Sequence, residues 1–93
     1  MAFYIYILSD DKNEKFIIGF TNNLVRQVHE LKHIQEGVVA NNKINKLIYY
    51  ETHKEFEEAK RREKEILMWD DDYTKTIISL QNSKFNDLYS KIF

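Results

Sequence analysis

The fold of this chain is indicated first by the stretch FYIYIL, residues 3–8, which consists of apolar, β-branched and aromatic residues. Such a stretch predicts a strand whose two faces are both at least partly covered. A polar, turn-rich segment, residues 9–14, and a second apolar run, residues 16–20, follow it, and together they predict a β-hairpin. Gly19 interrupts the second run, which indicates a bulge or a place where another group approaches the backbone closely.

The middle of the chain predicts one helix and a third strand. Asparagines suited to the N-cap precede apolar residues at helical spacing, so we expect a helix over about residues 23–35. Gly37 lies where a C-cap glycine is expected. A polar loop, residues 36–45, then leads into an apolar and aromatic run that predicts a strand over residues 46–51.

Three more helices are predicted in the second half of the chain. Thr52 and Glu55 fit a capping box, which indicates a long helix that ends near Trp69. The aspartates at residues 70–72 can cap a third helix, since their charge suits the positive end of the helix dipole. Ser83 can cap a short final helix. The expected core positions are Phe56, Ala59, Ile66 and Leu67 in the first, Tyr73, Ile77 and Leu80 in the second, and Phe85, Leu88 and Ile92 in the third.

The predicted order β-β-α-β-α-α-α places the chain in the α/β (α+β) class. Ninety-three residues are room for one domain, residues 1–93, and 43% hydrophobic residues are typical of a globular protein. The sequence contains no proline, no internal repeat and no low-complexity segment. We therefore expect one domain with one functional surface.

Composition excludes several classes of protein. Without cysteine, disulfides and thiolate metal sites are impossible, so only hard-metal, carboxylate-based chemistry stays open. The first apolar run does not resemble a signal peptide, and no stretch approaches the roughly 18 apolar residues of a membrane span, so we expect a cytoplasmic protein without membrane contact. The net charge of −1 and the pI of about 6.3 are a poor match to nucleic acid.

The clearest chemical signal is Glu63, which falls in the apolar stripe of the long helix, seven residues after Phe56 and three before Ile66. Its carboxylate is predicted to face the sheet, where an unpaired charge is costly. One interpretation is that Glu63 lies at the rim of the stripe and pairs with a Lys or Arg across the interface. The other is that Glu63 is a functional carboxylate.

The basic run at residues 60–64 surrounds this glutamate. Glutamates four residues earlier allow ion pairs along the helix, such as Glu57 with Arg61 and Glu58 with Arg62. We favour an ordinary salt-bridged surface over a phosphate-binding patch.

Two pairs of residues carry weaker signals. His29 and His33 have the spacing of paired metal ligands, but no third ligand has a recognisable spacing to them, so a solvated surface is favoured. Tyr4 and Tyr6 share one strand face, where tyrosines are more often packing residues than acids or bases.

Five short motifs occur in order between residues 3 and 88: YIYIL (4–8), IIG (17–19), TNNL (21–24), AKRREK (59–64) followed by Trp69, and Asn82 with Phe85, Asp87 and Leu88. By these motifs the chain resembles the stand-alone bacterial GIY-YIG domain proteins, whose domain is similar to the N-terminal nuclease domain of an excinuclease. YIYIL stands for the GIY element and IIG for the YIG element.

The resemblance implies a small three-stranded antiparallel sheet flanked by helices and, in active relatives, hydrolysis of phosphodiester bonds in DNA. It implies that Glu63 is the ligand of one Mg²⁺, which polarises the phosphoryl oxygen, and that Tyr6 lies beside the attacking water. Gln27 occupies the position of the catalytic arginine. We expect substrate contacts from Gly19, Arg26, Arg62 and Asn82.

The chain departs from the family pattern at reactive positions. Ile17 replaces the second tyrosine, and Leu31 replaces a histidine. Gln27 can hydrogen-bond a phosphate but lacks the charge of arginine, and losing one such electrostatic contact commonly costs roughly a hundredfold or more in rate. Arg26 cannot simply replace it, because one residue turns a helix by about 100°. Aspartates at residues 70–72 follow the tryptophan, where relatives carry basic residues.

These departures favour a pseudo-nuclease, a GIY-YIG domain with a degenerate active site that binds nucleic acid or a protein partner. The alternative is a weak or specialised Mg-dependent DNA endonuclease. The retained carboxylate of Glu63 favours this alternative, whereas the near-neutral charge weakens the case for DNA as a partner.

Overall fold

The computed structural model describes residues 1–35 and 43–93, and its centre is one antiparallel sheet with the strand order β2-β1-β3. The central strand is β1 (Phe3–Ser9), which pairs with β2 (Phe16–Thr21) on one side and β3 (Lys46–His53) on the other. The predicted hairpin and third strand are confirmed. Gly37 and most of the predicted loop lie outside the described residues.

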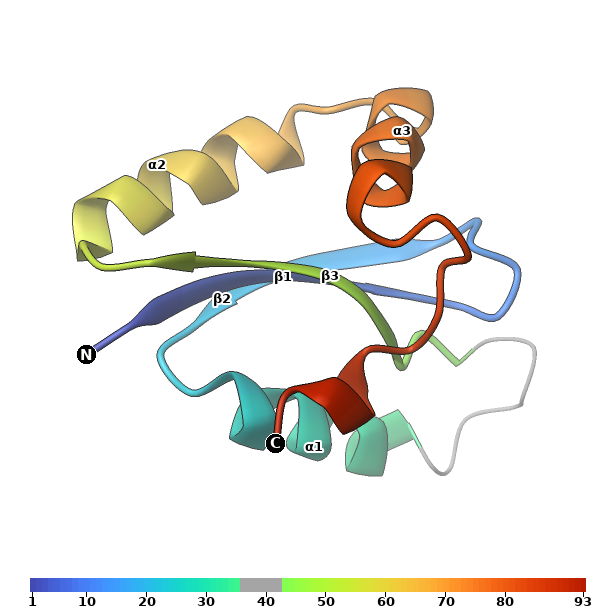
Figure 1. Cartoon of the computed structure of the whole chain (residues 1–93), viewed down its shortest axis with the longest axis horizontal. Helices are drawn as coiled ribbons and strands as arrows, with labels where there is room; N and C mark the ends of the chain where they lie inside the picture. The colour runs from blue at the N-terminus through green and yellow to red at the C-terminus, as the bar shows by residue number, and fades with distance from the viewer. Residues whose placement is uncertain (36–42) are drawn as a thin grey trace.

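Helices cover both faces of the sheet, so the domain has three layers (Figure 1). On one face lies α1 (Leu24–Ile34) with the short 3₁₀ helix η3 (Tyr89–Lys91) beside it, and on the other lie α2 (Phe56–Leu67) and α3 (Asp71–Gln81). This is the predicted α+β arrangement. No helix within the described residues is both long and apolar enough to cross a membrane.

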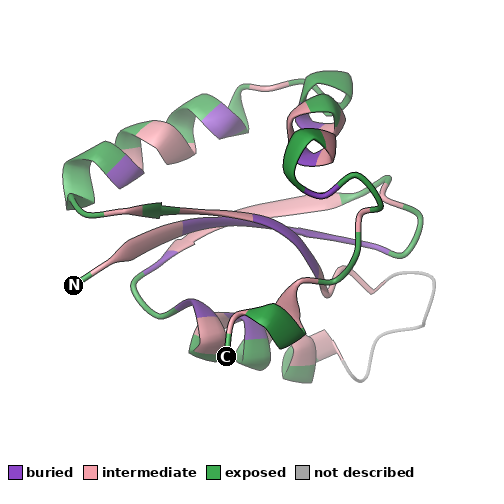
Figure 2. Ribbon diagram, in the orientation of Figure 1, coloured by how far each residue is buried: buried purple, intermediate pink, exposed green. Residues whose placement is uncertain are grey.

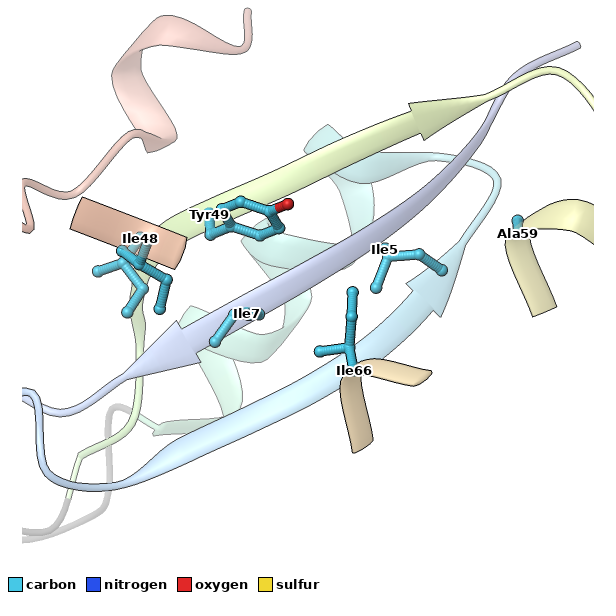
Figure 3. Packing of buried hydrophobic residues seen from close by; sticks show 7 residues of the cluster. Ile5, Ile7, Ile48, Tyr49, Ala59 and Ile66 are labelled. Carbon is cyan, nitrogen blue, oxygen red and sulfur yellow. The ribbon is translucent and has the colours of Figure 1, made fainter. Parts of the chain in front are cut away.

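The alternation of β1 divides the core into two clusters. Ile5 and Ile7 point toward α2 and α3, where Ile66 packs against the sheet (Figure 3). Tyr6 and Leu8 point toward α1 and pack with its apolar residues. The buried residues lie along β1, the first half of β3 and the helix faces turned to the sheet (Figure 2). Tyr4 therefore shares the α1 face with Tyr6, as predicted.

A β-bulge in β3 changes which of its residues face α1. Ile7 pairs with Tyr49 and Leu8 with Leu47, so Ile48 is the extra residue. Ile48 and Tyr49 consequently pack in the cluster under α2 and α3. Leu47 and Tyr50, three residues apart, both pack on the α1 side.

The N-cap predicted for α3 is confirmed, whereas the capping box predicted for α2 is not. Asp70 caps α3 by accepting a hydrogen bond from the Tyr73 backbone N–H at 2.8 Å, as predicted for this aspartate run. The capping box of Thr52 and Glu55 is wrong, because Thr52 still belongs to β3 and Glu55 makes no side-chain cap.

The core faces predicted for α2 and α3 are partly wrong, as the exposed fractions of their side chains show. The buried residues that these helices turn to the sheet are the predicted Ala59 and Ile66, together with Thr74 and Ile78. The predicted Ile77 is partly buried and packs against the same cluster. Four of the expected core residues are instead exposed, namely Phe56, Leu67, Tyr73 and Leu80.

The predicted final helix after Ser83 does not form, and only η3 is helical there. Phe85 has a φ of 53°, which no α-helix allows, and its side chain packs under α2 and α3. Leu88 packs instead on the α1 side, and its N–H bonds the Leu47 carbonyl at 2.7 Å. The segment thus passes from one layer to the other around the end of the sheet, which a single helix could not do.

Candidate functional site

The site begins with Tyr6 at the centre of β1, a residue that is only 5% exposed. Its direct partner on β2 is Gly19. A side chain at position 19 would overlap the ring and hydroxyl of Tyr6, so the ring lies over the bare backbone of the glycine. The group predicted to approach Gly19 closely is therefore the Tyr6 side chain. Because β2 is an edge strand, the hydroxyl lies toward the rim of the sheet.

Two of the predicted catalytic residues change the pKa of this hydroxyl. Burial raises the pKa of Tyr6 above its ordinary value, a hydrogen bond with the Gln27 side chain partly offsets that increase, and the negative charge of Glu63 adds to it. Gln27 comes from α1 and Glu63 from α2, so the helices on opposite faces of the sheet both contribute. Gln27 thus contacts the Tyr6 hydroxyl, and the charge of Glu63 acts on it from the other side of the sheet.

Among the described residues, Glu63 has a hydrogen-bond partner on one oxygen. Its side chain is 17% exposed, and its Oε1 accepts a hydrogen bond from the Lys60 ammonium at 2.9 Å. Lys60 also lies 4.6 Å from the ring centroid of Phe20 on β2, which holds the ammonium against the sheet. The carboxylate faces the sheet as predicted, although its cation comes from the same helix and not from across the interface.

The two other replaced positions have become part of the apolar core. Ile17, opposite Leu8, and Leu31 on α1 both pack against the cluster that contains Tyr6. Neither side chain can donate or accept a proton. The polar character of the site therefore comes from Tyr6, Gln27 and Glu63.

A hollow of about 250 Å³ adjoins the site at the start of α1. Gln27 and Arg26 both line it, so the turn of one residue along the helix does not separate them into different surfaces. The Arg26 side chain is 75% exposed, and its Nε donates to Glu30 at 3.0 Å. A surface pair of this kind breaks easily, which leaves Arg26 able to reach a ligand in the hollow.

Arg62, another predicted substrate contact, belongs to a separate ion-pair network on the α2 face. Its Nε and Nη2 donate to the Glu51 carboxylate at 2.9 to 3.1 Å, and its Nη1 donates to Glu65 at 3.1 Å. The guanidinium also lies 5.0 Å from the Trp69 ring, and its pKa is raised, first by the hydrogen bonds with Glu51. The predicted pair with Glu58 is not formed.

Glu51 is the centre of this network. Burial favours the neutral acid, but hydrogen bonds from Arg62, Tyr49 and His53 outweigh burial and lower the pKa of Glu51. Burial, together with the Glu51 carboxylate, raises the pKa of Tyr49 to about 12. His53 contacts Glu51 through Nε2, and its other ring nitrogen, Nδ1, lies 2.8 Å from the Glu58 carboxylate.

Asn82 and the two histidines of α1 also have structural partners. The Asn82 amide donates to the carbonyls of Ile48 and Asn86 at 3.0 and 2.9 Å, which anchors the segment after α3 to the sheet. His29 and His33 are exposed, and His29 lies 3.2 Å from the Tyr89 hydroxyl. Among the described residues, no group of three or more metal-binding side chains is suitably placed to hold an ion.

A divalent cation would therefore rest on Glu63 alone. One carboxylate suits Mg²⁺, which keeps several waters and completes its shell with substrate phosphates. The Lys60 ammonium already contacts Oε1, so an ion would compete with it for that oxygen or take Oε2.

Comparison with known proteins identifies the family and agrees with the fold. The sequence profile of the GIY-YIG catalytic domain matches residues 2–77. The chain belongs to the GIY-YIG family. The solution NMR structure of a UPF0213 protein from Bacillus halodurans has the same fold, with a TM-score of 0.60 and 19% identity over 94% of this chain and 93% of that one. A comparison with curated proteins finds no match.

Sequence reasoning missed the partner of Glu63 and the ion-pair network around Glu51. The i, i+3 spacing of Lys60 and Glu63 is visible in the sequence, but only the fold shows that this pair lies beside Tyr6. The network around Glu51 depends on β3 and α2 coming together, and no local pattern reports that contact.

Proposed function

We propose that this GIY-YIG domain is a pseudo-nuclease that binds nucleic acid at its site without cutting it. The observation that carries the proposal is the charge balance around Tyr6. Gln27, its hydrogen-bonding neighbour, is neutral, and the Glu63 carboxylate is paired with Lys60. A phosphate at this site meets hydrogen-bond donors, and the charge of the nearby Lys60 ammonium is already offset by Glu63.

Each replacement removes one requirement of hydrolysis. Ile17 cannot relay a proton, and Gln27 cannot stabilise the negative charge that develops on a phosphate in the transition state. When bound at Glu63, Mg²⁺ would supply charge that polarises a phosphoryl oxygen. An ordinary tyrosine already keeps its proton at neutral pH, and burial raises the pKa of Tyr6 further, so its hydroxyl remains a hydrogen-bond donor.

Of the four predicted substrate contacts, two fit this proposal. Gly19 leaves room for the Tyr6 ring over its backbone, and Arg26 lines the hollow beside Gln27. The other two residues, Arg62 and Asn82, are held by structural partners, and we assign them to the fold.

Cleavage assays test the absence of cutting. Plasmid, single-stranded and branched DNA would be incubated with the purified protein and Mg²⁺ or Mn²⁺, beside Glu63→Ala made in parallel. We expect the two proteins to show the same background. Cutting by the wild type that is lost in Glu63→Ala would contradict the pseudo-nuclease and establish the alternative, a weak Mg-dependent endonuclease.

Gel shifts at increasing salt test the binding. Arg26 is the cation that lines the hollow beside Gln27, so we expect only about two or three phosphate contacts. Affinity for a single strand should therefore fall roughly tenfold between about 50 and 200 mM salt. A protein that shifts no nucleic acid at low salt would disprove this function and indicate a protein partner.

A further inference from the structure

A second hollow lies beside the loop that joins β2 to α1, and the site around Tyr6 uses neither its tyrosines nor its lysine. It has a volume of about 380 Å³, within the range of pockets that hold small molecules. We call it the tyrosine pocket. Tyr4 and Tyr50 line it from the sheet, Asn22 and Asn23 from the loop, and Lys91 from η3, which Figure 1 shows beside α1.

The two tyrosines are neighbours on one face of the sheet. Tyr4 pairs with Thr52 and Tyr6 with Tyr50, so Tyr4 and Tyr50 stand diagonally across β1 and β3. Both are half-buried, and neither hydroxyl has a hydrogen-bond partner among the described residues. Their rings thus offer an aromatic wall and two available hydroxyls to a ligand.

The charge of the tyrosine pocket differs from that of the whole protein. Lys91 is its one charged lining residue, it forms no ion pair with the described residues, and no carboxylate lines the pocket. The net charge of the chain is −1, and another hollow, between Glu55 and Arg61, is lined by three glutamates. An anion with a flat ring therefore fits the tyrosine pocket and is repelled from the other hollow.

The tyrosine pocket is continuous with the GIY-YIG site. Asn22 and Asn23 line both the tyrosine pocket and the hollow that holds Arg26 and Gln27. Tyr50 is also the direct cross-strand partner of Tyr6. A ligand in the tyrosine pocket thus lies one loop away from a phosphate at the site.

We infer that the tyrosine pocket binds one unpaired nucleotide of a nucleic-acid strand whose backbone continues to the GIY-YIG site. The base lies against Tyr4 and Tyr50, and the phosphate pairs with Lys91. Aromatic side chains bind unpaired bases in this way because every base has a π-face to stack. The inference rests on the proposed function for the strand, while the nucleotide chemistry rests on the pocket itself.

Fluorescence anisotropy with a labelled single strand and a blunt duplex tests the inference. Tyr50→Leu removes the ring but keeps an apolar side chain, and we expect it to weaken single-strand binding about tenfold, with a smaller effect on the duplex. Lys91→Gln should weaken it severalfold and reduce the salt dependence. Tyr50→Phe keeps the ring and should bind nearly as the wild type does.

Lys12→Gln is the matched control, because Lys12 is exposed in the hairpin turn at the opposite end of the sheet from Tyr4 and Thr52. Thermal melts show that each variant is folded. If the wild type binds the strand and both pocket variants bind like Lys12→Gln, the tyrosine pocket is wrong while the proposed function stands.

NMR titration with a nucleoside monophosphate separates the remaining outcomes, with inorganic phosphate and the nucleoside as controls. We expect shifts at Tyr4, Tyr50 and Lys91 that are larger with the nucleotide than with either control. Shifts without any strand binding would overturn the strand and leave a site for free nucleotides. No shifts and no strand binding would overturn the inference and the proposed function together.

Discussion

Two glutamates on the α2 side of the sheet have opposite surroundings. Glu51 receives hydrogen bonds from Arg62, Tyr49 and His53, so both of its oxygens are occupied. Glu63 receives one, from Lys60, on one oxygen. A carboxylate with every oxygen bonded serves the fold, whereas one with a free oxygen beside a buried tyrosine remains available for chemistry.

The comparison also shows that the support of α2 is independent of the replaced residues. The network around Glu51 joins β3 to α2 and does not depend on Ile17, Gln27 or Leu31. Replacement of the reactive residues therefore leaves the support of α2 intact, and α2 still holds Glu63 near Tyr6.

The largest expected effect on stability comes from breaking the ion-pair network around Glu51. Arg62→Ala leaves the half-buried Glu51 without its strongest partner, so we expect a loss of about 2 kcal/mol in the free energy of unfolding and a fall in Tm of roughly 10 °C. Differential scanning calorimetry measures both. Arg61→Ala removes an exposed neighbour and should change stability by less than about 0.5 kcal/mol. Equal effects would mean that the network does not support the fold.

A similar loss of stability is expected at Gly19, because the Tyr6 ring occupies the space that a side chain there would need. Gly19→Ala forces the Tyr6 ring to move, which we expect to cost about 2 kcal/mol, as overpacking of a core commonly does. Urea unfolding measures this change. Tyr6→Leu shortens the side chain, so the double variant should lose less stability than the sum of the two single variants. Simple additivity would show that the two positions do not meet.

His53 makes the stability of the network around Glu51 depend on pH. Its two ring nitrogens lie 2.8 Å from Glu58 and 3.0 Å from Glu51, and the hydrogen bond with Glu58, followed by that with Glu51, raises the pKa of His53. Since the folded pKa lies above the unfolded one, the stabilisation is complete below about pH 6.5 and is lost as the pH rises through the folded value.

His53→Gln tests this pH dependence. The wild type should exceed the variant in Tm near about pH 6, by an amount that corresponds to less than about 1 kcal/mol, and the difference should shrink by about pH 9. A difference that does not change with pH would mean that the histidine acts only through packing or neutral hydrogen bonds.

The smallest effect on stability is expected at Glu63. Glu63→Gln breaks a partly exposed pair and should change stability by less than about 1 kcal/mol. It should lower the pKa of Tyr6, because the charge of Glu63 raises that pKa. Titration of ¹³C-labelled tyrosines by NMR measures the shift, and Glu65→Gln is the control. An unchanged pKa would place the carboxylate too far from the hydroxyl to act with it.

Local patterns in the sequence predicted what depends on neighbours along the chain. The alternation of FYIYIL assigned Tyr4 and Tyr6 to one face, and helical spacing turned Glu63 toward the sheet. The resemblance to GIY-YIG proteins then selected Tyr6, Gln27 and Glu63, which the fold brings together. The assignments of Tyr4, Tyr6 and Glu63 to their faces succeeded because periodicity of two in strands and of 3.6 in helices is a property of the backbone itself.

The tertiary structure alone decided which distant groups are partners. Arg62 pairs with Glu51 on β3 and not with Glu58 on its own helix, and the bulge at Ile48 places Tyr50 on the same face as Tyr4. The segment after α3 crosses between layers in place of forming a helix. Such contacts depend on strand register and on how the layers pack, and neither is encoded in the spacing of residues along one element.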